Sequence, residues 1–454
     1  MEGLTWTIQF SYQLTTNKTS GIYFDTRITL AFHLLIRDKA KTFKDSYLNI
    51  LFVHQNFPGQ YKHLAPALSA KGHRVVALGI GDRKIEGVEY FHYRPKRGTS
   101  EKTHPWVTDF EAKVIRAEAC ANACNELKHR GFEPDVICVH PGWGEALLLR
   151  EVWPDAKQLH FVEFFYGSIG RDVGFDPEFP SPEFSGNCRL RIKNTNNLLN
   201  LFDMDQGISP TQWQKSTVPE QFRDKIVVIH DGIDTARLSP DPSAVMNATN
   251  DRGENISLSS SQRVITFINR NLEPSRGYHQ FMRALPHIFR QDPEVQVVII
   301  GGDGVSYGAA PEKGSWKQQY LDEVRDKIEL KRVHFLGKVS YDTFIKAMQI
   351  SSAHVYLTYP FVLSWSMLEA MSLGAPLVGS RTPPVEEIIK EGINGRLVDF
   401  FSPEEIARVS LEVANSENSK MRAKARQTIV DHYDLNATCL PQQIALIENL
   451  ATAK

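Results

Sequence analysis

The chain has 454 residues and carries 52 Lys and Arg against 53 Asp and Glu, a formal net charge of -1 at pH 7. This balance excludes a global field that would recruit nucleic acid or an anionic membrane. The length exceeds what one hydrophobic core supports and predicts two domains or three. The five cysteines form no CxxC pair, which favours a reducing, cytoplasmic compartment.

The first 47 residues show neither strict alternation nor a sustained helical period. Their longest apolar run, residues 28–36, is too short to span a bilayer, and no cleavage-like signal follows it. We expect residues 1–47 to be a poorly ordered extension that is dispensable for folding and activity. The chain as a whole is expected to be soluble, and peripheral contact with the inner face of a membrane stays open.

From residue 48 onward, short apolar runs rich in β-branched residues alternate with amphipathic stretches. Such runs are typical of strands buried in a parallel sheet, and the stretches between them of helices that cover the sheet. This alternation predicts an N-terminal Rossmann-like domain over residues 48–239. The runs are "LNILFVHQ", "RVVALGI", "DVICVH", "QLHFVEFF" and "KIVVIHDGID".

A polar segment, residues 240–262, interrupts this pattern and is interpreted as a linker or flexible insertion because it is rich in Ser, Asn and Asp. The strand and helix alternation then restarts and predicts a second Rossmann-like domain over residues 263–454, with closing helices at the C-terminus. The expected fold class is α/β, with two facing doubly wound domains. Ligands of such sheets bind beyond the carboxyl ends of the strands, so we expect the site in the cleft between the domains.

Two arginines, Arg270 and Arg276, lie where a predicted strand ends and a helix is about to begin, in "INRNLEPSRGYHQF". Guanidinium groups at such a place can clamp a diphosphate through charge-assisted hydrogen bonds. Spacing alone leaves a second reading open, in which both are solvated loop arginines.

The segment "FVLSWS" precedes another predicted helix, so its free amides and the helix dipole form an anion site. Ser364 and Ser366 are both candidate N-caps. Glu369 has two interpretations at this point. It can close a capping box with Ser366, or it can accept hydrogen bonds from a ribose diol in the cleft.

His140 ends the strand "DVICVH" and is followed by glycines that permit close approach, although an inert loop histidine is the alternative. Glu163 ends another strand and is either a structural or a catalytic acid. Gly59 either makes the turn after the first strand or lets a phosphate approach the backbone. We find no metal-binding cluster in the sequence, so leaving-group charge would fall to Arg270 and Arg276.

Taken together, the chain from Leu48 onward resembles the retaining glycosyltransferases of family 4, which have the two-domain GT-B fold. The resemblance rests on the order and spacing of "ILFVHQNFPGQYKHLAPAL", "DVICVH", "VVIHDGID", "INRNLEPSRG", "VHFLG" and "LEAMSLGAPLVGS…VEEIIKEGINGRLV". It implies a nucleotide-diphosphate-sugar donor bound mainly by the second domain, and no other cofactor.

The resemblance also implies roles for individual residues. Arg270 and Arg276 would neutralise the diphosphate, and Glu369 would bind the ribose. The strand from Val333 to Gly337 would lie near the nucleobase. The remaining matches are Ser364, Trp365 and Ser366 for phosphate, His140 beside the donor sugar and acceptor, and Gly59 near the diphosphate.

One departure concerns Phe361, which stands where the family usually has a glutamate that contacts the donor sugar. A phenyl ring cannot accept those hydrogen bonds, although it can stack on an apolar sugar face. The expected activity is metal-independent transfer of a hexosyl group to a glycan or lipid-linked acceptor, in polysaccharide biosynthesis. The alternatives are a nucleotide-sugar epimerase, a phosphorylase on the same fold, and a non-catalytic nucleotide-sugar binder.

Overall fold

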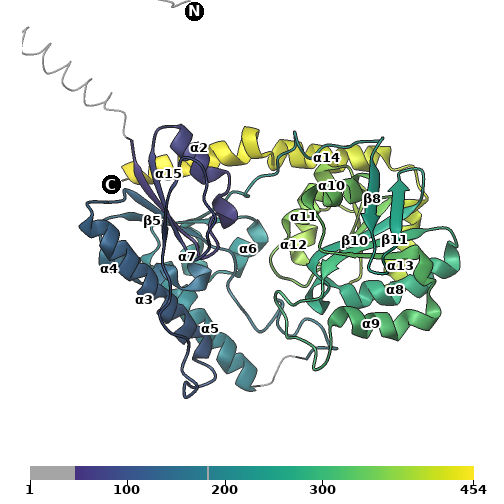
Figure 1. Ribbon diagram of the computed structural model, residues 1–454, viewed down its shortest axis with the longest axis horizontal. Coiled ribbons are helices and arrows are strands. Elements are labelled where there is room, and N and C mark those ends of the chain that lie inside the picture. Colours follow the sequence, from purple (N-terminus) through teal and green to yellow (C-terminus); the bar gives the residue numbers. More distant parts are fainter. Residues whose placement is uncertain (1–46, 181–183, 454) are drawn as a thin grey trace, which may run out of the picture. The chain divides into compact units, whose positions relative to one another are not determined.

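The structure is a computed structural model that describes residues 47–180 and 184–453 (Figure 1). The predicted N-terminal extension, apart from Tyr47, lies outside the described residues. The remainder forms two α/β lobes, each built on its own parallel sheet, which confirms the expected fold class.

The N-terminal lobe contains a seven-stranded parallel sheet in the order β3-β2-β1-β4-β5-β6-β7. Helices α2 (Leu64–Ala70) and α15 (Leu440–Thr452) pack on one face, and α3 (Thr108–His129) and α4 (Leu149–Val152) on the other. Helices α5 (Phe184–Asp203), α6 (Gln212–Thr217) and α7 (Glu220–Arg223) complete the lobe. The strands are β1 (Asn49–Val53), β2 (Arg74–Gly79), β3 (Glu89–His92), β4 (Val136–Val139), β5 (Lys157–Phe161), β6 (Gln206–Ser209) and β7 (Ile226–Val228).

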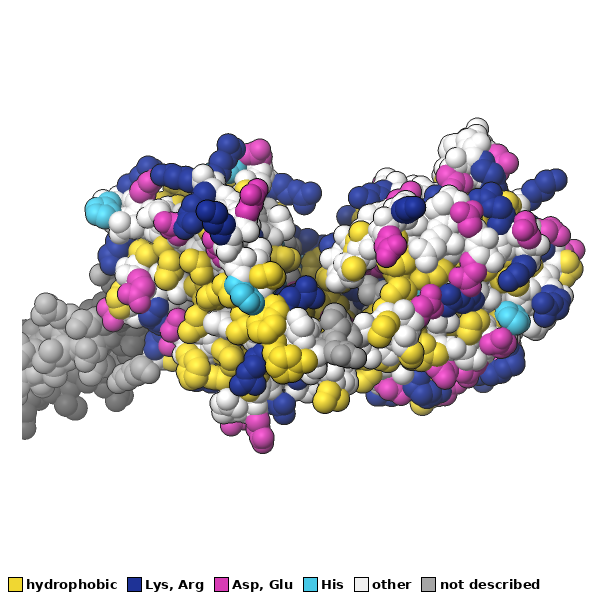
Figure 2. Space-filling view, turned by 90° about the horizontal axis from the view of Figure 1, so that it is seen from below, with side chains coloured by type: hydrophobic (Ala, Val, Ile, Leu, Met, Phe, Trp, Pro, Cys, Tyr) yellow, Lys and Arg dark blue, Asp and Glu magenta, His cyan; other side chains and the backbone are white. Residues whose placement is uncertain are grey.

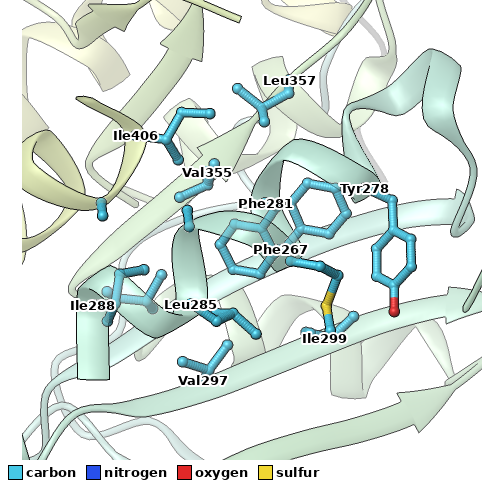
Figure 3. Close-up of a cluster of buried hydrophobic side chains, with 14 of the residues drawn as sticks. Phe267, Tyr278, Phe281, Leu285, Ile288, Val297, Ile299, Val355, Leu357 and Ile406 are labelled. Atoms are coloured by element: carbon cyan, nitrogen blue, oxygen red, sulfur yellow. The ribbon is translucent and has the colours of Figure 1, made fainter. Parts of the chain in front are cut away.

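The C-terminal lobe contains a six-stranded parallel sheet in the order β12-β11-β10-β13-β14-β15. One face carries α8 (Tyr278–Gln291), α9 (Trp316–Val324) and α13 (Pro403–Ala414), around stacked Phe267 and Phe281 (Figure 3). The other face carries α10 (Tyr341–Gln349), α11 (Trp365–Ser372) and α14 (Ser419–His432), and α12 (Pro383–Glu386) is short. The strands are β10 (Val264–Asn271), β11 (Gln296–Gly302), β12 (Val333–Gly337), β13 (Ala353–Tyr356), β14 (Leu377–Ser380) and β15 (Arg396–Val398).

The composition of the polar segment 240–262 predicted a linker or flexible insertion. The segment instead has regular structure. It contains an antiparallel hairpin of β8 (Val245–Thr249) and β9 (Asn255–Ser259). Met246 and Leu258 face each other on the buried side of the hairpin. Its turn is tied to β12, because the Asp251 amide donates to the Phe335 carbonyl at 2.8 Å. The alternation was present in the sequence, but polar residues on the outer side obscured it.

Their place in the sequence predicted that the C-terminal helices all belong to the second lobe. They are in fact divided between the two lobes. Helix α14 packs on the C-terminal lobe, whereas α15 packs on the N-terminal lobe, where Ile447 is fully buried. Glu448 of α15 forms an ion pair with Lys71 at 2.6 Å. The end of the chain is therefore a structural part of the first domain.

The surface agrees with the charge balance of the sequence. On the face shown in Figure 2, Lys and Arg side chains are interspersed with Asp and Glu over both lobes. Among the described residues, no helix combines the length and the apolar character needed to cross a bilayer.

Candidate active site

A large cavity, open to solvent, is lined by residues from both lobes. The N-terminal lobe contributes the segments that follow β1, β2, β4 and β5. The C-terminal lobe contributes the segments at the ends of β10 and β11 and the loop before α11. Because the carboxyl ends of parallel strands form the binding edge of such sheets, the cavity lies where the topology predicts a ligand site.

Gly59 lies in the turn after β1 and lines this cavity. Its backbone has φ of 49°, and an added Cβ would lie 2.8 Å from the imidazole of His54. Only glycine therefore fits here. Burial, assisted by the neighbouring His140, lowers the pKa of His54 to about 3, so this imidazole is neutral at pH 7.

His140 directly follows β4, and its buried imidazole lies between the rings of Trp143 and Phe161. Its Nδ1 accepts a hydrogen bond from the Gly142 amide at 3.2 Å, so in the neutral ring the proton is on Nε2. That Nε2 lies 3.6 Å from Glu163 Oε2 and has no hydrogen-bond partner among the described residues. It is therefore a buried donor without an acceptor, on a residue that lines the cavity.

Glu163 is the carboxylate that lies beside His140, and both residues line the large cavity. Burial by itself raises its pKa, but the opposing effects of His140, Arg270 and Arg276 are larger, and the net pKa is lowered. The acid therefore stays ionised at neutral pH.

Arg270, the penultimate residue of β10, is exposed and lines the cavity. Its guanidinium makes no ion pair or hydrogen bond with another described residue. This geometry is what an anion ligand requires of a fixed cation.

Arg276 differs from the expectation that it lines the cleft beside Arg270. It is only 7% exposed and does not line the cavity. Its guanidinium donates to Thr358 Oγ1 at 2.8 Å and to the Val362 carbonyl at 3.2 Å, and lies over the ring of Tyr307. In this structure Arg276 supports the loop before α11. Its positive charge also helps to lower the pKa of Glu163.

Helix α11 begins at Trp365, with Ser364 as its N-cap. Ser364 Oγ accepts from the Ser366 amide at 3.4 Å and lies 2.9 Å from Ser366 Oγ. The Trp365 amide has no acceptor within the part of the chain that the structure describes. Because Trp365 lines the cavity, this free amide and the positive end of the helix are close to its interior.

The structure excludes one of the two interpretations of Glu369, the capping box. Its Oε1 accepts a hydrogen bond from the Tyr341 hydroxyl at 2.6 Å, and it lies too far along α11 to cap the helix. Glu369 lines a second, smaller cavity, and Trp365 lines both cavities. Burial raises the pKa of this carboxyl. The capping-box interpretation is therefore wrong.

Phe361 lines the large cavity but is not a free stacking platform. Its ring makes edge contacts with Phe164 of the N-terminal lobe at 4.7 Å and with Tyr307 of the C-terminal lobe at 5.0 Å. Its carbonyl accepts from Trp213 Nε1 at 3.0 Å. The residue that replaces the usual glutamate therefore joins the two lobes.

The strand predicted to lie near a nucleobase is only partly available to a ligand. Val333 begins β12 and is fully buried in the core of the C-terminal lobe, so it cannot contact one. Gly337 ends the strand, with φ of 61° and open space around its Cα. Of the two ends, only Gly337 lies at the binding edge of the sheet.

Sequence reasoning missed several residues that line the two cavities, including Lys62, Asp231, Tyr307 and Tyr341. Asp231 accepts a hydrogen bond from Trp365 Nε1 at 2.7 Å, and Lys62 lies over the Trp365 ring. A signal for Asp231 was present, since it closely follows β7. Within the described part of the chain, no group of three or more His, Cys, Asp or Glu residues is arranged to hold a metal ion.

Two family models match the chain, one for each lobe. The glycosyl transferase family 4 group matches residues 71–238, and glycosyl transferases group 1 matches residues 251–429. Together they cover most of both lobes. The chain belongs to glycosyltransferase family 4.

Similar proteins extend over both lobes of the glycosyltransferase. Spore coat protein SA of Bacillus subtilis is 23% identical over 389 residues, 80% of this chain and 86% of that protein. The structure of Anabaena Alr3699/HepE in complex with UDP and glucose has a TM-score of 0.60 at 16% identity, and covers 89% of this chain and 100% of that one. Sucrose-phosphate synthase from Thermosynechococcus elongatus has a TM-score of 0.66 at 15% identity, over 90% and 100% of the chains. These structures share the GT-B fold.

Proposed function

We propose that the glycosyltransferase moves a hexosyl group from a nucleotide-diphosphate sugar to a glycan or lipid-linked acceptor, with retention of the anomeric configuration. The observation that carries this proposal is the unpaired Arg270 guanidinium, which lines the same cavity as the free amide end of α11 and the glycine turn at Gly59. These are three kinds of group that bind phosphate oxygens. The bound UDP in HepE supports a donor of this class.

The nucleotide would extend from the large cavity into the smaller one. In this arrangement the diphosphate lies against Arg270 and the Trp365 amide, and the ribose hydroxyls replace the Tyr341 hydroxyl as donors to Glu369. His140 Nε2 would donate to the donor sugar from the opposite lobe. Arg276 would act indirectly, because it holds in place the loop that ends at Ser364.

In the proposed reaction, the bond between the anomeric carbon and the departing phosphate oxygen breaks first, leaving positive charge on the sugar ring. The acceptor hydroxyl forms the new bond on the same face, and its proton passes to the departing phosphate oxygen. The protein contributes orientation and stabilisation of negative charge on the diphosphate, rather than a nucleophile. We propose that guanidinium and amide groups supply this stabilisation without a metal ion, so a chelator should leave activity unchanged.

The proposal is tested with a panel of nucleotide diphosphates and their sugars. We expect one donor class to raise the Tm, and to raise it further the more tightly the donor binds at a given concentration. Transfer assays with that donor should give a product with the donor's anomeric configuration, which NMR coupling constants report. An inverted product would overturn the retaining mechanism. Donor binding without transfer or hydrolysis would instead favour a non-catalytic binder.

Arg270→Gln tests the role of the free guanidinium. Removing one pre-organised charge-stabilising group costs about 10²–10³ in rate, so turnover should fall by that factor with little change in Tm. Arg290→Gln is the matched control, because Arg290 is an exposed arginine in the last turn of α8, outside the cavity. If both variants turned over like the wild type, Arg270 would have no part in the reaction.

We also propose a cytoplasmic location and a role in polysaccharide biosynthesis. All five cysteines lie in the described part of the chain as free thiols, and four of them are buried. Free thiols are typical of reducing compartments.

A further inference from the structure

The N-terminal lobe contributes a cationic wall to the large cavity, on segments distinct from those assigned to the donor. Three positively charged residues form it: Arg83, which follows β2, and Arg189 and Lys193 on α5. We call these three the cationic wall. The whole chain has a net charge of -1, so this concentration of positive charge is a local feature of the cavity.

Lys193 is the most enclosed member of the cationic wall. Its Nζ lies 4.0 Å from the centre of the Tyr166 ring, and it forms no ion pair with a described residue. Burial lowers the pKa of this ammonium group, although Asp109 and Asp172 act in the opposite direction. A partly desolvated cation that rests on a ring face gains stabilisation when an anion binds beside it.

Arg189 and Arg83 are exposed and likewise form no ion pair with another described residue. The carboxylates in this part of the cavity do not cancel the charge. Asp109 is already paired with Lys113 at 2.8 Å. That leaves Asp172, whose pKa burial raises, against three cations that form no ion pair with a described residue.

Aromatic rings stand next to the cationic wall. Trp106 and Tyr166 both line the cavity and are partly exposed. The Trp106 indole is held toward α5, because its Nε1 donates to Ser185 Oγ at 3.3 Å. Exposed ring faces bury the apolar C–H face of a sugar, while neighbouring polar groups fix its orientation.

We propose that this part of the cavity is an acceptor subsite for a saccharide that carries a phosphate or carboxylate group. The sugar ring lies against Trp106, and the anionic group lies between Arg189 and Lys193, which is held over the Tyr166 ring, with Arg83 at the edge. This inference deepens the proposed function, because it assigns a chemical class to the acceptor of that reaction. Guanidinium and ammonium groups without partners recognise such anions by charge-assisted hydrogen bonds.

The test measures binding of matched sugars by thermal shift and saturation-transfer NMR, with and without nucleotide diphosphate. The probes are glucose, glucuronate and glucose 6-phosphate. A charge-assisted contact is worth about tenfold or more in affinity, so both acidic sugars should bind at least that much tighter than glucose. Added salt should weaken the acidic sugars and leave glucose unchanged.

Variants on α5 locate the subsite. Arg189→Gln and Lys193→Gln should each reduce the preference for acidic sugars about tenfold. Arg191→Gln should not, because Arg191 is an exposed cation on the same helix that does not line the cavity. Equal binding of glucose and the acidic sugars would overturn the inference. So would no saturable binding of either acidic sugar, or equal effects of all three substitutions.

A further arm presents glucose linked to a polyprenyl phosphate in phosphatidylcholine vesicles. Sensitivity to Arg189→Gln in this arm assigns a lipid-linked source, and sensitivity with the free sugars assigns a soluble one. Either result supports the subsite. Failure of the proposed function is seen separately, as the absence of any Tm rise with nucleotide-diphosphate sugars while the acidic sugars still bind.

Discussion

At the scale of single residues, Asp231 is a buried carboxyl that the sequence did not single out. It lines the smaller cavity beside Glu369, and its Oδ2 accepts a hydrogen bond from the Trp365 indole. Burial raises its pKa from the ordinary value of 3.8 to about 7, with Glu163 adding to the effect and Trp365 opposing it. The folded state therefore binds a proton at pH values where the unfolded chain has lost it.

This difference predicts how stability depends on pH. The folded state binds more protons between pH 3.8 and about 7, so the contribution of Asp231 to stability falls as pH rises through that window. Asp231→Asn removes the titration and keeps an acceptor for Trp365. We expect the Tm of the variant to rise relative to wild type as pH increases from 5 to 8. Parallel Tm profiles would show that Asp231 titrates alike in both states.

Phe361 shows how far the sequence could define the site. The substitution of the family glutamate was visible, and so was the loss of its hydrogen bonds to a sugar. Its partners were not, because Phe164 and Tyr307 lie about 200 and 54 residues away and meet it only in the folded chain. The same reason applies to Arg276. Its place after a strand was predicted, but its contacts with Thr358 and Val362 depend on the packing of another loop.

At the scale of elements, the sequence predicted most of the buried strands, because continuous apolar runs such as residues 48–55 have few other structures open to them. It missed β3, which is half exposed, β6, which is only four residues long, and the hairpin of β8 and β9, whose outer side is polar. It also assigned α15 to the wrong lobe. The sequence pattern of an amphipathic helix indicates that the helix has an apolar face, but it does not indicate which lobe that face covers.

The placement of α15 predicts that truncating an apolar side chain on its buried face lowers the free energy of unfolding. Ile447 is fully buried in the core of the N-terminal lobe, and truncating such a side chain costs about 2–5 kcal/mol. Ile447→Ala should therefore lower the free energy of unfolding by that amount in urea denaturation. Gln442→Ala, at an exposed position of the same helix, should change it by less than about 0.5 kcal/mol. A similar small effect for both would mean that α15 is not part of that core.

At the scale of the whole described molecule, each lobe sends contacts into the other. Residues 173–180, from the connection between β5 and α5 in the N-terminal lobe, pack on α8 and the core of the C-terminal lobe; we call them the interlobe strap. Its Phe175 ring contacts Tyr359 at 5.1 Å. In the other direction, the Glu387 carboxylate accepts from the Gln212 and Trp213 amides at the start of α6. These contacts hold the lobes together around the cavity.

Asp176 is the most deeply buried charge of the interlobe strap. Its Oδ2 accepts from His279 Nε2 at 2.9 Å and from the Tyr359 hydroxyl at 2.7 Å, and Asp176 and His279 are 2% and 0% exposed. Burial alone raises the pKa of this carboxyl, but the two hydrogen bonds outweigh it and the net pKa is lowered. Removing the Asp176 carboxylate would leave the His279 and Tyr359 donors buried without an acceptor.

Asp176→Ala should therefore destabilise the protein by about 3–5 kcal/mol and speed proteolytic cleavage within the interlobe strap. Glu178→Ala is the matched control, because Glu178 pairs with Arg283 at 2.6 Å on the same strap but is partly exposed, and such pairs contribute about 1 kcal/mol or less. Scanning calorimetry and limited proteolysis measure both effects. If the two variants lost equal stability, the buried contact with His279 would add nothing to the cohesion of the lobes, and the strap would act through its phenylalanines alone.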